Sequence, residues 1–174
     1  MRFEDYLLKH GKAIEVAKND YILRQGEPCG DLYFIRQGIL KAHYLTLEGK
    51  EFVKSFLMEG DLIGSLSAAY EGELASFSVI SLEDSHLIQL NFNKLMEQCN
   101  DELALARDMI EFLLLLAMKK EKREYEFLCL TPEARYDSLA RSRPELLERV
   151  TQQDIAAYLG VTAVGLSRIL KRRR

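Results

Sequence analysis

One stretch near the C-terminus, residues 151–171 with the sequence TQQDIAAYLGVTAVGLSRILK, decides the fold of that end of the chain. Thr151 followed three residues later by Asp154 resembles a capping box at the start of a helix. Gly160 then ends the helix, because a left-handed backbone is unstrained only for glycine. Thr162 is placed to cap a second helix. The apolar residues that would bury the two helices against each other are Ile155, Ala156, Leu159, Val161, Leu166, Ile169 and Leu170. This register predicts a helix-turn-helix, which lays its second helix in the major groove of DNA.

The outer surface of this unit supplies the candidate DNA contacts. On the second helix only Arg168 can make a bidentate contact to guanine, whereas Ala163 and Val164 can pack on thymine methyl groups. The basic run 171–174 is placed to neutralise phosphates. We expect the DNA-binding residues to be Thr151, Gln152, Thr162, Ala163, Val164, Ser167, Arg168, Lys171 and Arg172. So few hydrogen-bonding side chains predict modest specificity that rests partly on DNA shape. The alternative is a helical hairpin that only packs.

The charge of the chain is divided between its two ends. Residues 151–174 hold five basic residues and one acid, a net of +4, which leaves −7 on residues 1–150 because the whole chain carries −3. An acidic body with a basic end suits the binding of a polyanion at that end. A solvated C-terminus would carry the same charges, so charge alone does not decide between them.

A long helix is predicted upstream, over residues 101–127. Its apolar residues recur every three or four positions and form two stripes. The first stripe is Leu103, Ala106, Ile110, Leu113 and Ala117. The second stripe is Leu105, Met109, Phe112 and Leu116. One stripe can pack on the preceding domain and the other needs a partner, so we expect the first stripe to form a homodimer interface. A helix buried wholly in its own domain is the alternative.

The N-terminal half has the pattern of an antiparallel sheet. Between residues 21 and 91, short apolar runs alternate with glycine-containing turns, which predicts a β-barrel or jelly roll. Residues 1–18 are predicted to be helical, with a break near Gly11. The expected fold class is α+β, with a sensor barrel over residues 1–100, a dimerisation helix over 101–127 and an all-helical helix-turn-helix domain over 128–174. Thr131 and Pro132 mark the start of that last domain.

Composition narrows the classes of function. The 174 residues are 48 % hydrophobic, enough for a buried core. Cys29, Cys99 and Cys129 are odd in number and far apart, which disfavours disulfides and cysteine-ligated metals. The N-terminus is charged throughout and the apolar runs are too short to span a bilayer, so we expect a cytoplasmic protein.

Catalytic and metal-binding patterns are absent from the sequence. His10, His43 and His86 are scattered and form no H-x-H pair, which disfavours a metal site of the kind found in cupin barrels. No Ser-His-Asp arrangement and no phosphate-binding loop is evident. We therefore expect no enzyme activity, no metal and no catalytic residues.

Two segments carry a resemblance to a known family. Residues 22–38, ILRQGEPCGDLYFIRQG, look like the first cyclic-nucleotide-binding signature, and Gly60–Gly64 resembles the start of the second. The barrel, long helix and helix-turn-helix, in that order, resemble the catabolite activator (Crp–Fnr) family over nearly the whole chain. The resemblance implies a homodimer, a ligand pocket in the barrel and regulated binding to a palindromic operator in double-stranded DNA. It also makes RNA polymerase a candidate partner.

The candidate ligand pocket departs from the family pattern. Where the family has a glutamate for the ribose hydroxyl, this chain has Ser65, and where it has an arginine for the cyclic phosphate, this chain has Ala75, next to Ser76. The segment Gly64–Ser78 contains no basic residue, so a buried phosphate would lose its main charge-assisted bond. We expect the pocket to comprise Gly64, Ser65, Leu66, Ala75 and Ser76. Its ligand would be something other than cyclic AMP, a more apolar molecule, or none. Cysteines at an iron–sulfur spacing are also absent, so no cofactor is expected.

The C-terminal end gives a further departure. The family usually continues into a β-hairpin wing, whereas this chain stops at Arg174. Wingless relatives and truncated chains both end in this way, and in either case the phosphate contacts of a wing are missing. Because the predicted DNA-contacting face is poor in hydrogen-bonding groups, the alternative function is a module that senses or dimerises without sequence-specific DNA binding.

Overall fold

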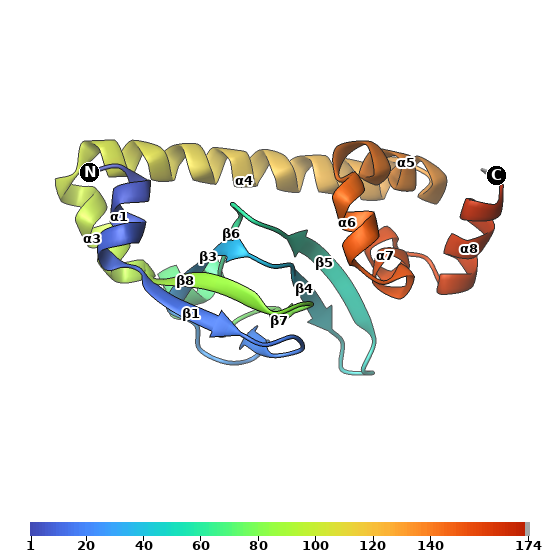
Figure 1. Ribbon diagram of the computed structural model, residues 1–174, viewed down its shortest axis with the longest axis horizontal. Coiled ribbons are helices and arrows are strands. Elements are labelled where there is room, and N and C mark those ends of the chain that lie inside the picture. The colour runs from blue at the N-terminus through green and yellow to red at the C-terminus, as the bar shows by residue number, and fades with distance from the viewer. Residues whose placement is uncertain (173–174) are drawn as a thin grey trace.

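The computed structural model describes residues 1–172, and its N-terminal part is a jelly roll (Figure 1). The strands are β1 (Lys12–Val16), β2 (Tyr21–Leu23), β3 (Asp31–Gln37), β4 (Leu40–Leu45), β5 (Glu51–Leu57), β6 (Leu62–Ile63), β7 (Ser78–Ser81) and β8 (Ser85–Asn91). They form two four-stranded sheets, in the orders β1-β8-β3-β6 and β2-β7-β4-β5. The strand pairs are antiparallel, which confirms the predicted architecture.

The core of the jelly roll lies between the two sheets. Ile35 on one sheet and Leu40 and Val79 on the other are completely buried. The turn between β3 and β4 depends on Gly38, whose φ of +114° is open to glycine alone in practice. A Cβ at Gly38 would also lie 2.0 Å from the Ser85 hydroxyl oxygen. A side chain at this position would therefore meet both a strained backbone and the start of β8.

The N-terminal segment differs from the prediction of a helix over residues 1–18. The helix α1 spans only Phe3–His10, and residues 12–16 form β1, which pairs with β8. Gly11 separates the two, and a Cβ there would lie 2.1 Å from Ile88 Cγ2. The free edge of β8 decides the outcome, because pairing satisfies the backbone groups of residues that a helical pattern also fits.

Three helices follow or interrupt the jelly roll: α2 (Leu66–Glu71), which the sequence did not predict, α3 (Phe92–Asp101) and α4 (Leu103–Cys129). The backbone leaves the helical conformation at Glu102, between α3 and α4. The long helix therefore begins and ends two residues later than predicted. In Figure 1 it passes from the end of the jelly roll near α1 to the C-terminal helices.

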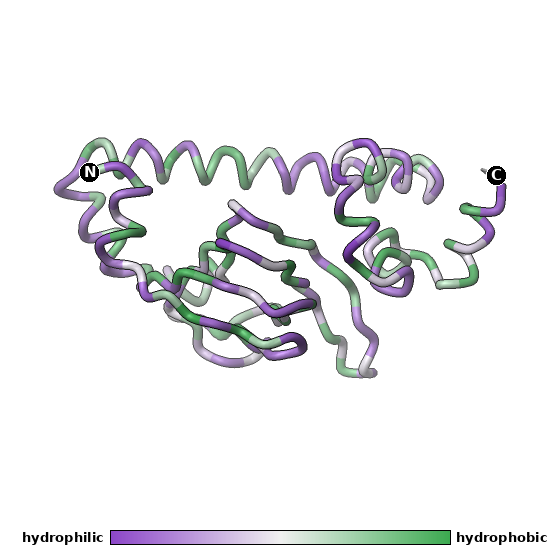
Figure 2. The backbone as a smooth tube through the Cα atoms, in the orientation of Figure 1, coloured by the Kyte–Doolittle hydropathy of each residue, from purple (hydrophilic) through white to green (hydrophobic). Residues whose placement is uncertain are grey.

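The two apolar stripes of α4 have different environments. Leu105 and Met109 of the second stripe are buried against the jelly roll. In the first stripe, Leu103, Ile110 and Leu113 are 66 %, 59 % and 45 % exposed. Figure 2 shows hydrophobic residues along the middle of α4 and hydrophilic ones toward its C-terminal part. The helix therefore has one covered apolar face and one uncovered apolar face.

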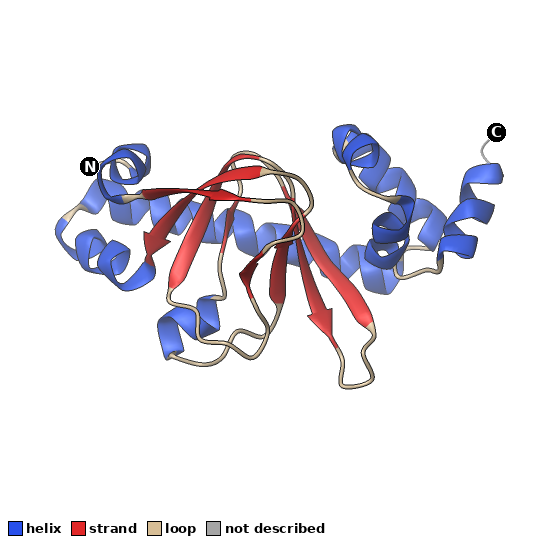
Figure 3. Ribbon diagram, turned by 60° about the horizontal axis from the view of Figure 1, so that its bottom comes forward, coloured by secondary structure: helices blue, strands red, loops and turns tan. Residues whose placement is uncertain are grey.

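The C-terminal domain consists of α5 (Pro132–Ser142), α6 (Pro144–Arg149), α7 (Gln152–Leu159) and α8 (Ala163–Lys171). Thr131 caps α5 by accepting a hydrogen bond from the Ala134 amide, as predicted. Figure 3 shows these helices at the opposite end of the molecule from α1 and α3. Within residues 1–172, no helix combines the length and the apolar character that crossing a membrane requires.

Candidate nucleic-acid interface and barrel pocket

The helix-turn-helix has the predicted capping geometry. The Asp154 amide donates to the Thr151 hydroxyl oxygen over 3.1 Å, and that hydroxyl donates to the Asp154 carboxylate over 2.6 Å. Gly160 has φ +70° and ends α7. The Gly165 amide donates to the Thr162 side chain over 3.1 Å at the start of α8. Thr151 and Thr162 satisfy backbone groups at helix termini and Gly160 permits the turn, so the bihelical unit follows from local chemistry.

The outer face of α8, comprising Thr162, Ala163, Val164, Ser167 and Arg168, is open to solvent. The other predicted DNA contacts, which are Thr151, Gln152, Lys171 and Arg172, are exposed as well. On the inner side of α8, Leu166 and Ile169 are buried. Arg172 forms an ion pair with Glu133 over 3.3 Å. The predicted contacts at Arg173 and Arg174 lie outside the described residues.

The helix α7 packs directly on the jelly roll. Its Ile155 and Leu159 share an apolar cluster with Val53 and Phe56 of β5, and the rings of Phe56 and Tyr158 lie 5.4 Å apart. Because α8 packs on α7, this contact sets the orientation of α8 relative to the barrel.

Polar contacts reinforce the same interface. Lys41 of β4 donates to Asp154 over 2.9 Å. Arg149 forms ion pairs with Glu59 and Glu83, and its hydrogen bond holds the pKa of Glu59 at about 2, well below the usual 4.5. The helix-turn-helix is thus joined to the sensor barrel by both apolar and ionic contacts.

The long helix also holds α7. Arg123 of α4 donates to the carbonyl oxygen of Tyr158 over 2.5 Å, and its guanidinium lies 3.8 Å from the centre of the Tyr158 ring. Burial lowers the pKa of Arg123. Helix α7 is therefore held by the barrel on one side and by α4 on the other.

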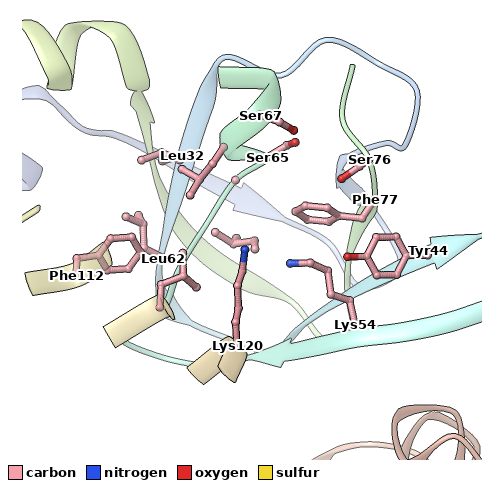
Figure 4. Close-up of a pocket in the computed structure, with 14 residues that line it drawn as sticks. Leu32, Tyr44, Lys54, Leu62, Ser65, Ser67, Ser76, Phe77, Phe112 and Lys120 are labelled. Atoms are coloured by element: carbon pink, nitrogen blue, oxygen red, sulfur yellow. The ribbon is translucent and has the colours of Figure 1, made fainter. Parts of the chain in front are cut away.

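The barrel contains a pocket of about 230 Å³ between the jelly roll and α4 (Figure 4). Its lining residues are Leu32, Tyr44, Lys54, Leu62, Ile63, Gly64, Ser65, Leu66, Ser67, Ser76, Phe77, Phe112, Leu116 and Lys120. Four of the five predicted pocket residues are among them, namely Gly64, Ser65, Leu66 and Ser76.

Ala75 is the exception, because it does not line this pocket. It is 2 % exposed and belongs to the barrel core. Its amide donates to the Glu27 carbonyl, and its own carbonyl accepts from the Gly26 amide. These bonds hold the backbone so that the small side chain packs inside the barrel.

Two pocket lysines were missed by the sequence analysis, which looked for basic residues only in Gly64–Ser78. Lys54 comes from β5 and Lys120 from α4. Burial, together with repulsion from Lys120, lowers the pKa of Lys54 to about 8. The signal for Lys120 was present, because it follows Phe112 and Leu116 at the next helical repeat. No sequence pattern on β5 indicates that Lys54 lines the pocket.

Within residues 1–172, no group of three or more histidine, cysteine or carboxylate side chains is placed to hold a metal ion. Cys29 is buried, Cys99 half-buried and Cys129 exposed, and all three are free thiols.

Comparison with known proteins identifies the class of the jelly roll. The sequence profile of the cyclic nucleotide-binding domain family matches residues 13–102, so the chain belongs to that family. The "Anaerobic regulatory protein" of Pasteurella multocida is 29 % identical over 97 % of this chain and 64 % of its own length. Across the first curated relatives, the chain spans between 64 % and 72 % of the relative's length.

Solved structures share the whole arrangement. The global regulator CLP of Xanthomonas campestris, described as c-di-GMP-responsive, has a TM-score of 0.77 at 17 % identity and covers 98 % of this chain and 89 % of its own. The catabolite activator protein of Thermus thermophilus has a TM-score of 0.61 at 21 % identity, over 97 % and 81 %. Within the cyclic nucleotide-binding class, the chain is similar over nearly its whole length to transcription regulators of the Crp/Fnr type, and the relatives that it matches are regulators rather than enzymes.

Proposed function

We propose that the chain acts as a homodimeric transcription regulator that binds a palindromic operator through α8. The observation that carries this proposal is the capped helix-turn-helix, whose second helix has a buried inner side and an outer face exposed to solvent. Such a helix fits the major groove, and two copies must lie about 34–36 Å apart to reach successive grooves. RNA polymerase is a candidate partner of the DNA-bound dimer.

The proposed dimer forms through the first stripe of α4. Its leucine and isoleucine side chains remain uncovered in a single chain, and Leu114 and Met118 add to the exposed apolar surface. Continuous apolar surface on a helix of this length is typical of a dimer seam. The same helix carries Arg123, so the dimer seam and α7 are joined by one rigid element.

We propose further that the barrel senses a ligand other than cyclic AMP. Ser65 and Ala75 replace the glutamate and arginine on which the family's cyclic nucleotide pocket depends, and Ala75 does not reach the pocket. CLP of Xanthomonas campestris, which has a similar fold, is described as c-di-GMP-responsive. A change of ligand on this scaffold is therefore compatible with the fold.

The first test is selection of DNA by the full chain from fragments of its own genome, at about physiological salt and without added ligand. A recurrent palindrome in the bound fragments would support the proposal. The variant Arg168→Ala should lose this enrichment, whereas Arg141→Ala, which removes the same charge from α5, should keep it.

The second candidate function is a sensing or dimerising module without sequence-specific DNA binding. The small side chains of Ala163, Val164 and Gly165 on α8 favour it, because they offer no hydrogen bonds to base edges. Binding to duplex DNA with a steep salt dependence but equal affinity for all sequences would select this function and exclude the first.

A further inference from the structure

The barrel pocket contains two cationic groups that lack a carboxylate partner. On α4, the neighbouring Lys119 and Lys122 form ion pairs with Asp61 and Glu126. Lys54 and Lys120 form no ion pair with any residue in the range 1–172, although Lys54 lies 4.2 Å over the Phe77 ring. Figure 4 shows the two ammonium groups pointing toward one another. Two like charges held together without a counter-ion favour the arrival of an anion between them.

Neutral polar groups surround the same space. Ser65 is only 1 % exposed, and its hydroxyl has no hydrogen-bond partner within the described chain. A buried hydroxyl without a partner costs free energy unless a ligand or water satisfies it. Ser67 and Ser76 line the pocket nearby. The serines and lysines together form a set of donors for the oxygen atoms of an anion.

The remainder of the pocket is apolar. Leu62 of β6, Phe77 before β7 and Phe112 of α4 form its sides. Its volume of about 230 Å³ lies below the range of roughly 300–1,000 Å³ that is usual for sites of drug-sized molecules. The pocket therefore suits a small molecule with an anionic end and a compact apolar body. Inorganic phosphate would leave the apolar sides without contacts.

From this arrangement we infer that the pocket binds a small organic carboxylate, with its charged group between Lys54 and Lys120 and its apolar body against Phe77, Leu62 and Phe112. The binding site stands on its own geometry, whereas the regulatory consequence rests on the proposed function. The site spans the barrel and α4, because Lys54 belongs to one and Lys120 to the other.

The ligand would act on the position of α4. Without an anion the two ammonium groups repel each other, and a carboxylate between them draws α4 toward β5. Arg123, less than one helical turn beyond Lys120, contacts Tyr158 of α7. A ligand that binds one position of α4 more tightly shifts the population toward it, so carboxylate binding changes the orientation of α8.

The test uses ¹⁹F NMR on the purified full chain with 4-fluorobenzoate and its neutral counterpart 4-fluorobenzamide. We expect the carboxylate to bind and the amide to bind at least about tenfold more weakly, because it loses the charge-assisted contacts. Lys54→Met and Lys120→Met should each weaken carboxylate binding by about tenfold. Lys122→Met, on the same helix but outside the pocket, should leave it unchanged. Unfolding temperatures identify any variant that fails to fold.

Other probes separate the outcomes. Acetate, phenylacetate, inorganic phosphate and cyclic AMP are compared by competition against 4-fluorobenzoate, and by direct titration should that probe not bind. Equal binding of amide and carboxylate, unchanged binding in both lysine variants, tighter binding of cyclic AMP or phosphate, or no carboxylate binding would each overturn the site.

DNA affinity is measured on the same samples. Carboxylate binding without any DNA binding would remove the proposed function and leave the site, whereas DNA binding unaffected by a bound carboxylate would remove only its regulatory role.

Discussion

Arg168 is the one side chain on the outer face of α8 that is able to discriminate a base pair by a bidentate hydrogen bond. We expect Arg168→Ala to weaken binding to the cognate operator by about 1–3 kcal/mol and to relax preference at one base pair. The measurement is a titration of labelled operator duplexes that differ at single positions. Arg141→Ala on α5 is the charge-matched control. Unchanged cognate affinity in Arg168→Ala would show that α8 contacts DNA through another face.

Gly165 presents a different test, because its backbone does not require glycine. Its φ lies outside the left-handed region, and an added Cβ would meet the Thr162 hydroxyl oxygen at 3.3 Å, a tight contact that a shift of a few tenths of an ångström in the capping side chain would relieve. Alanine in a helix is favoured over glycine by up to about 1 kcal/mol.

We therefore expect Gly165→Ala to leave stability unchanged or to raise it by up to about 1 kcal/mol in urea unfolding, while it weakens operator binding. The reason for the weaker binding is that the methyl group would keep the helix backbone from the DNA. Gly160→Ala serves as the contrasting variant and should destabilise, because Gly160 has φ +70°. Full DNA affinity in Gly165→Ala would mean that no close approach occurs at this position.

Among the secondary-structure elements, α4 is the one whose sequence provides two separate apolar faces. One of its faces packs on the jelly roll, and the first stripe remains exposed. The helix needs both faces apolar because it would serve two interfaces, one within the chain and one between chains. The proposed dual role accounts for the hydrophobic residues around much of its middle.

The proposed dimer seam can be tested with Leu113→Glu. A carboxylate buried in an apolar seam has no partner there, so we expect a loss of about 3 kcal/mol or more, at least a hundredfold in Kd. Sedimentation equilibrium measures the result. Leu47→Glu, at a fully exposed position in the β4–β5 turn, makes the same chemical change without touching α4 and should remain dimeric. A dimeric Leu113→Glu variant would place the interface elsewhere.

At the level of the whole molecule, the orientation of the helix-turn-helix depends on contacts between segments that are distant in the sequence. The ion pair between Arg149 of α6 and Glu59 in the β5–β6 turn is one of them. Since the folded-state pKa of Glu59 is depressed to about 2 from 4.5, its contribution to stability is present above about pH 4.5. It is lost progressively as the pH falls toward 2.

We therefore expect Glu59→Gln to be less stable than the natural chain at pH 7 and to approach it in stability as the solution is acidified. Urea unfolding between pH 7 and pH 3 measures this convergence. Glu73→Gln, in an exposed loop, should show no such pH-dependent difference. Because the Glu59 side chain is 39 % exposed, solvent screening keeps the effect small. A constant difference between Glu59→Gln and the natural chain at every pH would contradict the assignment.

Local chemistry was enough to predict the helix-turn-helix, the jelly roll and the long helix. Thr151, Gly160 and Thr162 act within one helical turn of the groups they cap, so their roles follow from spacing alone. The jelly roll followed from short apolar runs and glycine turns. The N-terminal helix was overextended because only pairing with β8 distinguishes residues 12–16 from a helical segment.

The pocket shows where such prediction ends. Gly64, Ser65 and Leu66 were predicted because they follow the segment that resembles the second signature, and Ser76 because it stands where the family has a serine or threonine beside its arginine. Ala75 was misplaced because the direction of a side chain depends on the backbone bonds of its loop, and Lys54 was missed because nothing in its own strand points to a ligand. To predict Lys120 as a pocket residue, one needs both the helical repeat of α4 and the knowledge that α4 lies beside the barrel.

The sequence was therefore sufficient for whatever depends on neighbours along the chain: helix caps, turns, hydrophobic period and the class of the domains. The tertiary structure alone decided which charges share a cavity and how α8 is held relative to the barrel. The physical reason is that backbone hydrogen bonding and capping act over a few residues. The electrostatic character of the pocket arises instead from the tertiary arrangement that places β5 and α4 on two sides of the same cavity, where two lysines from separate parts of the chain come together.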